Sequence, residues 1–117
     1  MLRSEARRMA QRVERDATRT GLKVTERINA VLTMDVPYEE KIAALKEAEE
    51  KGERELTWVI DRACKILREQ GVDTLDIGKY RGGAFSSVYR MKENVRKVRD
   101  IIEEQRVVDG IWSDALE

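Results

Sequence analysis

The sequence predicts an all-α fold in which a long antiparallel helical hairpin is followed by a glycine-rich connection and a third amphipathic helix. Apolar residues recur in steps of three and four along three stretches, which is the spacing of one face of an α-helix. Pro37, the one proline of the chain, disfavours helical conformation at Val36 and separates the first stretch from the second. Because 117 residues is a typical length for one domain, we expect residues 1–117 to form a single helical domain.

The first helix of the hairpin is predicted to span residues 4–35. It ends before Pro37, and Asp35 stands where its carboxylate can cap the exposed amides of the next helix. Its apolar seam consists of Ala6, Ala10, Val13, Ala17, Gly21, Val24, Ile28 and Val31.

The second helix is predicted to span residues 37–70. Glu39 and Glu40 lie in its first turn, near the positive end of the helix dipole. Arg68 and Gly71 indicate its end, since a cation suits the last turn and glycine tolerates the left-handed conformation that often follows. Its apolar seam consists of Ile42, Leu45, Ala48, Gly52, Leu56, Val59 or Ile60, Ala63 and Leu67.

The two seams also predict how the helices pair. With an antiparallel turn near residue 36, Gly21 is expected opposite Gly52, and Val13 opposite Ile60. Glycine in a helix interior costs about 0.8–1 kcal/mol relative to alanine, so two facing glycines would be explained by a close approach of the two backbones. The alternative is that one glycine breaks or kinks its helix.

The pattern changes after Gly71. Residues 71–85 are expected to form a connection with at most one short helix, and residues 86–106 a third helix that Ser86 or Ser87 caps. That helix either packs on the hairpin or pairs with a second copy as a coiled coil. Residues 107–117 form a tail whose Trp112 either docks or frays. The seam of the third helix consists of Val88, Met91, Val95, Val98 and Ile102.

Charge is balanced overall but unevenly distributed. The chain has 23 basic and 23 acidic residues. Residues 1–31 carry a net charge of +4, residues 32–76 of −5, residues 77–106 of +4 and residues 107–117 of −3. Such alternation suits subunits that meet basic surface to acidic surface better than it suits a polyanion. Because a hairpin is also too thin for a large core, we expect a homo-oligomer or a protein partner.

The composition excludes several classes of protein. The longest stretch without a charge, residues 82–89, is far shorter than the ~20 residues of a membrane-spanning helix, and no secretory signal is recognisable. We therefore expect a cytoplasmic protein with no membrane partner. The chain has no histidine, which removes histidine-based catalysis and most zinc sites. Cys64 stands alone in an apolar seam and is expected to be buried rather than reactive. We expect no enzyme activity, no cofactor and no metal site.

Residues 77–91 resemble the helix-turn-helix of bacterial and phage DNA-binding proteins. Gly78 matches the small residue of that motif, Gly82 the turn glycine four positions later, and Val88 and Met91 the inward positions of the following helix. In the motif, the second helix enters the major groove, and its early polar residues contact bases while neighbouring cations hold phosphate. The resemblance therefore implies DNA as a partner.

The segment departs from the motif at two positions, and the resemblance implies a set of contact residues. Arg81 and Gly83 depart from the motif, which usually has apolar residues there. The alternative is that the segment is a loop leading into an ordinary packed helix. The residues implied to contact bases are Ser86, Ser87, Tyr89 and Arg90, and those implied to lie near phosphate are Lys79, Lys92, Arg96 and Lys97.

Two hypotheses for function follow. The first is a small nucleic-acid-binding regulatory or packaging protein that uses residues 77–99 against DNA. The second is an all-helical protein-interaction module, such as an adaptor, an assembly subunit or an inhibitor, with no nucleic-acid binding. Tyr89 and Phe85 are expected at the surface in the second hypothesis. The spaced pattern of residues 77–91 favours the first.

Overall fold

The protein is all-α, which confirms the predicted fold class. The computed structural model describes the backbone of residues 3–116 and the side chains of residues 8, 9 and 11–112; the predicted seam residues Ala6 and Ala10 lie outside the described side chains. The helices are α1 (Arg3–Ala30), the short 3₁₀-helix η1 (Val31–Thr33), α2 (Tyr38–Glu69), α3 (Thr74–Ala84) and α4 (Ser86–Leu116).

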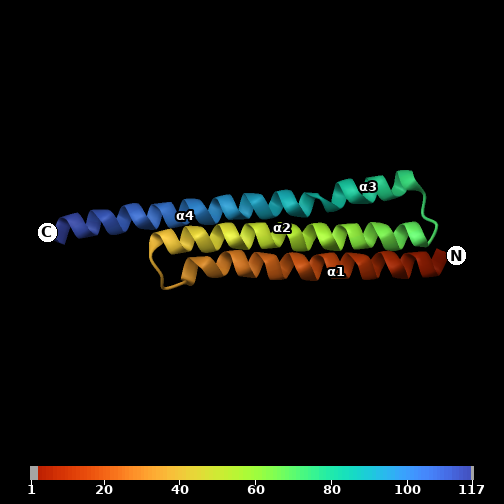
Figure 1. Ribbon diagram of the computed structural model, residues 1–117, viewed down its shortest axis with the longest axis horizontal. Coiled ribbons are helices and arrows are strands. Elements are labelled where there is room, and N and C mark those ends of the chain that lie inside the picture. Colours follow the sequence, from red (N-terminus) through yellow and green to blue (C-terminus); the bar gives the residue numbers. More distant parts are fainter. Residues whose placement is uncertain (1–2, 117) are drawn as a thin grey trace.

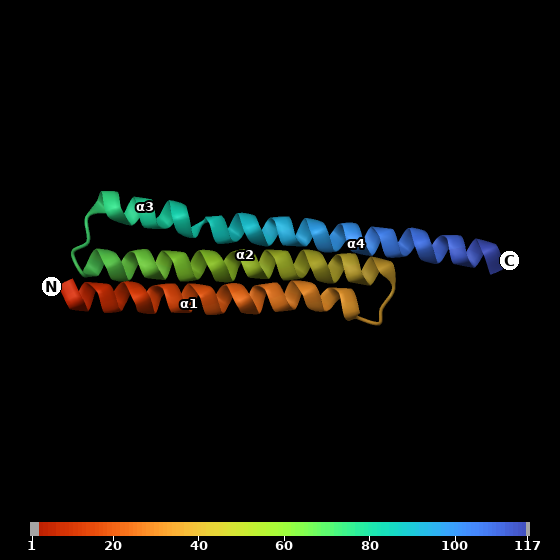
Figure 2. The same ribbon diagram turned by 180° about the vertical axis from the view of Figure 1, so that it is seen from behind.

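The helices form an elongated rod. The described part measures 73 × 21 × 17 Å. Helices α1 and α2 lie side by side and run in opposite directions, and α3 and α4 follow one another back along α2 (Figures 1 and 2). Helix α2 contacts α1, α3 and α4, whereas α1 contacts α4 but not α3 among the described residues. Helix α2 is therefore the central element of the rod.

The core lies along α2 and combines all three predicted seams. Val24, Ile28 and Leu45 are among its most buried side chains, with exposed fractions of 0–2%. Every predicted seam residue of the third helix is buried, so this helix packs on the hairpin within one chain. Cys64 is also buried, as expected. Burying an apolar side chain of this size stabilises the fold by about 1.5–3 kcal/mol relative to leaving it exposed. This gain explains why the apolar residues of the three predicted seams come together as the core.

The predicted pairing of the two glycines is wrong. Gly52 faces Val24 of α1 and Met91 of α4, and a Cβ added at Gly21 would meet nothing within 4 Å. The register is therefore shifted by about one helical turn. The cause is the link between the helices: the extended segment around Met34 and Pro37 carries the chain past the end of α1 before α2 begins (Figure 1). The neighbours of Gly52 do approach its backbone closely, but the contact joins three helices, α1, α2 and α4, rather than two.

The link also corrects the expected helix ends. The first helix gives way to a 3₁₀ turn after Ala30, and α2 starts at Tyr38 with Pro37 as its N-cap and no side-chain hydrogen bond at that cap. Asp35 is therefore not the capping residue. The carbonyl of Pro37 accepts hydrogen bonds from the amides of Glu40 and Lys41 at 3.0 Å each. The backbone of the proline, rather than the predicted carboxylate, thus organises the first turn.

The glycine-rich connection is mostly helix. Gly78, Gly82 and Gly83 all lie within the eleven-residue α3, although three helical glycines together cost about 3 kcal/mol relative to alanine. Ile77 is buried, and Tyr80 packs against the core, so the helix is held by one apolar side against α2. Tertiary packing outweighs the weak local propensity here.

The predicted tail is also helical. The third helix was expected to end at residue 106, but α4 continues without interruption to Leu116. Residues 107–112 contain no proline, the residue that most strongly opposes a helix, although Gly110 weakens it. Trp112 does not dock on its own chain, because 65% of its surface is exposed.

Gly71 is the one described glycine that needs a left-handed backbone. It ends α2 with a φ of +79°, as its place after Arg68 predicts. We expect Gly71→Ala to lower the free energy of unfolding by about 1–2 kcal/mol, because an L-residue is strained in this region. The matched control is Gly82→Ala, in a helix with open space at the Cβ, which is expected to raise stability by about 0.8–1 kcal/mol. Urea unfolding followed by circular dichroism measures the stability of both variants. Equal effects of the two substitutions would contradict the left-handed backbone of Gly71.

Candidate functional site

The segment that resembles a helix-turn-helix forms two helices in line. Phe85 is the single residue between α3 and α4, and its φ of −63° and ψ of −15° are helical values. The amide of Phe85 donates to the carbonyl of Arg81, and the amides of Val88 and Tyr89 donate to the carbonyl of Phe85. A helix-turn-helix instead joins helices at about 90–120° through a turn of three or four residues. The geometry of residues 77–91 therefore differs from that of the motif, and Gly82 lies in a helix rather than in a turn.

The residues implied to contact bases do not share one environment. Tyr89 is 71% exposed on the outer face of α4, and Arg90 is exposed at the edge of a groove. Ser86 and Ser87 are half-buried, and the Ser87 hydroxyl donates to the carbonyl of Ala84 at 2.7 Å. Phe85, expected at the surface, is half-buried under the guanidinium of Arg81.

The implied phosphate-binding residues are exposed but interleaved with acids. Lys79, Lys92, Arg96 and Lys97 are all exposed. The ammonium of Lys92 lies 3.4 Å from the carboxylate of Glu53, and the guanidinium of Arg96 pairs with Glu93. The outer face of α4 therefore carries both signs of charge.

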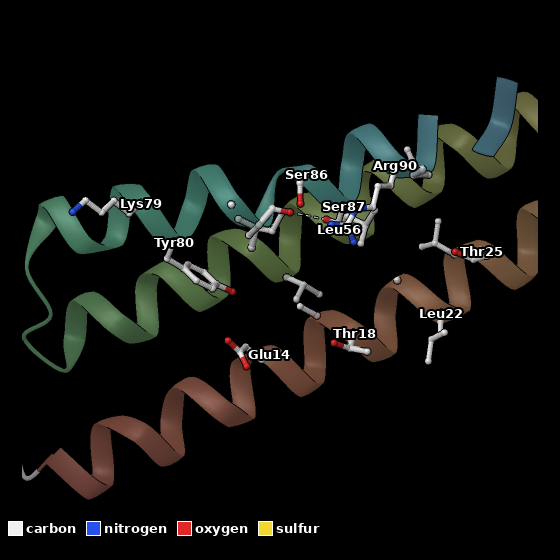
Figure 3. A pocket seen from close by; sticks show the side chains of 18 residues that line it. Glu14, Thr18, Leu22, Thr25, Leu56, Lys79, Tyr80, Ser86, Ser87 and Arg90 are labelled. Atoms are coloured by element: carbon white, nitrogen blue, oxygen red, sulfur yellow. Dashed lines mark hydrogen bonds between the residues drawn. The ribbon is translucent and has the colours of Figure 1, made fainter. Parts of the chain in front are cut away.

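A groove opens between α1 and the α3–α4 junction, with α2 as its floor. Its volume is about 750 Å³. The floor and walls are mostly apolar, and Figure 3 shows Tyr80, Ser86 and Arg90 on one side and Glu14, Thr18 and Leu22 on the other. The apolar and small residues that line this groove are Ala17, Gly21, Leu22, Val24, Leu56, Val59, Ile60, Tyr80, Gly83, Ala84 and Met91.

The groove exists because α3 contacts α2 and leaves α1 uncovered. Leu22 is 60% exposed at its edge, and Tyr80 is half-buried in its wall. Burial is the main cause that raises the pKa of the Tyr80 phenol above its usual value of 10, so this hydroxyl is neutral at physiological pH. Lys79 and Arg90 contribute two cations to the lining, and Glu14 contributes one carboxylate.

The second distinctive surface is the end of α4, residues 103–116, which we call the projecting end. Figure 1 shows this part of α4 running past the link between α1 and α2. Ile102 is the last buried residue of the chain among the described side chains. Beyond it, four large apolar side chains are 50–65% exposed: Val107, Val108, Ile111 and Trp112.

The base of the projecting end is fixed to the hairpin by a polar contact. The Tyr38 hydroxyl donates to the carboxylate of Glu103, and the guanidinium of Arg106 lies 4.2 Å from the centre of the Tyr38 ring. The hydrogen bond to Glu103 is the main cause that raises the pKa of Tyr38. This contact, together with burial of Ile102, sets the direction in which the last turns of α4 leave the rod.

The sequence prediction missed both surfaces. The groove has no sequence signal, because it results from how far α3 lies from α1. The projecting end has a partial signal in Val107, Val108, Ile111 and Trp112, whose steps of three and four continue a helical pattern past residue 106.

Among the described residues, no group of three or more acidic or cysteine side chains is arranged to hold a metal ion. Within the same part of the chain, no helix combines the length and apolar character needed to cross a membrane. No protein-family model matches the chain, and neither a curated protein nor a solved structure shows significant similarity to it.

Proposed function

We propose that this chain is a non-enzymatic helical module for protein–protein interaction, and that the projecting end of α4 is its main contact surface. One observation carries the proposal: four large apolar side chains are clustered within six residues, at least half exposed, on a helix that has left its own core. An exposed apolar cluster rimmed by polar residues is typical of protein interaction sites. Tryptophan in particular is enriched among the residues that dominate binding energy.

The charges favour a protein partner over DNA. Proteins that bind nucleic acids usually carry a clustered basic excess, whereas this chain has no net charge. On α4, Glu93 and Asp100 lie among the cations of the outer face, and two of those cations pair with carboxylates of the same chain. The in-line arrangement of α3 and α4 also offers no separate recognition helix.

The proposal is tested by placing a photo-crosslinking amino acid at position 112 and exposing the protein to the lysate of its host. We expect covalent adducts with protein, and we expect Ile111→Glu in the same chain to remove them, because a buried charge opposes apolar contact. The matched control carries the probe at Lys65, which is exposed on α2 away from both surfaces. Absence of adducts at 112, or equal adducts at 65, would overturn the proposal.

The competing hypothesis of DNA binding has its own measurement. We expect no gel shift of mixed-sequence DNA at low salt. A shift that Arg90→Ala with Lys97→Ala abolishes, while the helical circular dichroism is unchanged, would support DNA binding and contradict our proposal. Such binding would also weaken steeply as salt is added, because phosphate contacts release counterions.

A further inference from the structure

We propose that the groove receives the projecting end of α4 from a second copy of this chain. This inference rests on the proposed function and names the partner. Among the described residues, the groove and the projecting end are two large uncovered apolar surfaces: the groove lies between α1 and the α3–α4 junction, and the projecting end is the last part of α4. Docking of the projecting end in the groove would therefore cover apolar surface on both.

The groove is open and has room for a helix. A Cβ added at Gly21 or at Gly83, on its two sides, would meet nothing within 4 Å. Its volume of about 750 Å³ is open to water in the isolated chain. Since most of its lining is apolar, replacing that water by apolar side chains is favourable.

The lengths of the two surfaces agree. The α1 residues that line the groove run from Glu14 to Thr25, which is about 17 Å at 1.5 Å per residue. The apolar cluster from Val107 to Trp112 spans about 8 Å, and the whole projecting end about 20 Å. The groove is thus longer than the apolar cluster and slightly shorter than the whole projecting end.

Charge selects this pairing over contact between two projecting ends. Residues 107–117 carry three acids and no base, so two such segments brought together would repel one another. The two walls of the groove belong to segments of opposite sign, because residues 1–31 and 77–106 each have a net charge of +4, while the α2 residues of its floor, Leu56, Val59 and Ile60, are uncharged. Lys79 and Arg90 lie in the groove lining itself, and Arg15 and Arg19 lie on the adjoining outer surface of α1.

An exposed apolar strip of Ile101, Val108 and Trp112 is also on the correct side of α4, whereas Val107 and Ile111 lie on a neighbouring face of the helix. Arg90 lines the groove, and Ile101, Val108 and Trp112 follow it in steps of eleven, seven and four, which keep one helix face within a narrow angle. The strip and the groove therefore face the same side of the rod. Two rods laid antiparallel with these sides together place each projecting end on the groove of the partner, in a closed two-fold dimer.

The test uses disulfide trapping in purified protein. In a Cys64→Ala background, chains carrying Gly21→Cys and chains carrying Trp112→Cys are mixed and mildly oxidised; the control replaces Gly21→Cys with Lys65→Cys, which is exposed on α2 outside the groove. We expect the 21–112 pair to form a mixed dimer at several times the yield of the 65–112 pair. Equal yields would overturn the proposal.

Light scattering gives an independent measurement on the native chain. We expect a mass of twice 13.6 kDa for the parent and of 13.6 kDa for Trp112→Glu with unchanged circular dichroism. A dimer that survives Trp112→Glu, or a monomeric parent at high concentration, would overturn self-docking. A monomeric parent that still forms specific adducts from position 112 in lysate would overturn only this inference, whereas a monomer without adducts would overturn the proposed function as well.

Discussion

Replacing Gly52 with leucine is expected to lower the free energy of unfolding by about 3 kcal/mol or more, the upper end of what overpacking a core costs. Even a single added Cβ would lie 2.7 Å from the Sδ of Met91 and 2.7 Å from a methyl carbon of Val24. Met91 is flexible and can move, but Val24 is β-branched and 2% exposed, so it has no free rotamer to adopt. Helices α1 and α4 must therefore move away from α2.

The matched control is Gly21, which was expected from sequence to be its partner. Gly21→Ala has open space and is expected to raise stability by about 0.8–1 kcal/mol through helix propensity alone. Gly52→Ala has the same gain in propensity but is expected to be destabilising in net terms. Urea unfolding monitored by circular dichroism compares the two, and a Gly52→Ala chain as stable as the parent would contradict the three-helix contact.

A double-mutant cycle isolates the contact itself. Val24→Ala removes the methyl groups that face Gly52, so Gly52→Ala is expected to be less damaging in that background than in the parent. The two residues are in contact, and contacting pairs commonly show coupling energies of about 0.5–3 kcal/mol. Strict additivity would mean that Val24 does not limit the space at Gly52.

Leu45→Ala is expected to cost about 2–5 kcal/mol, which is the range for removing a fully buried leucine from a core. Leu45 is 0% exposed and belongs to the cluster that contains Val31 of η1 and Ile102 of α4, near the end of the hairpin. The loss includes both the apolar transfer energy and the cavity left behind. Because Ile102 is the last buried residue before the projecting end, loss of Leu45 also weakens the support of that end.

The control for this substitution is Leu75→Ala. Leu75 is 66% exposed on α3, so its truncation is expected to change stability by no more than about 0.5 kcal/mol. Thermal and urea unfolding of the two variants measure the difference. Similar effects at positions 45 and 75 would show that the hairpin end is not part of the cooperative core.

The sequence predicted most of the secondary structure because its signals are local. Val88, Met91, Val95 and Ile102 are all buried at the spacing that predicted them, and Gly71 ends α2 in the left-handed conformation. Where local signals are weak, the prediction of helices and their ends was less accurate. Helix α3 forms despite its glycines because Ile77 is buried against the rest of the core, and no local pattern reports that contact.

Local sequence patterns could not predict the register of α1 against α2, nor the groove and the projecting end. The extended link at Met34 to Pro37 moves α2 by about one turn relative to α1, and this decides that Gly52 meets Val24 rather than Gly21. The resemblance of residues 77–91 to a helix-turn-helix likewise depended on a turn near Gly82, where the chain remains helical.

By itself the sequence determined that this protein is a set of long amphipathic helices, because the period of the apolar residues specifies which face of each helix is buried. Only the tertiary structure decided where those helices leave apolar surface uncovered. The groove and the projecting end both result from the position and length of one helix relative to another, and such relations between distant segments are set by packing and not by spacing along the chain.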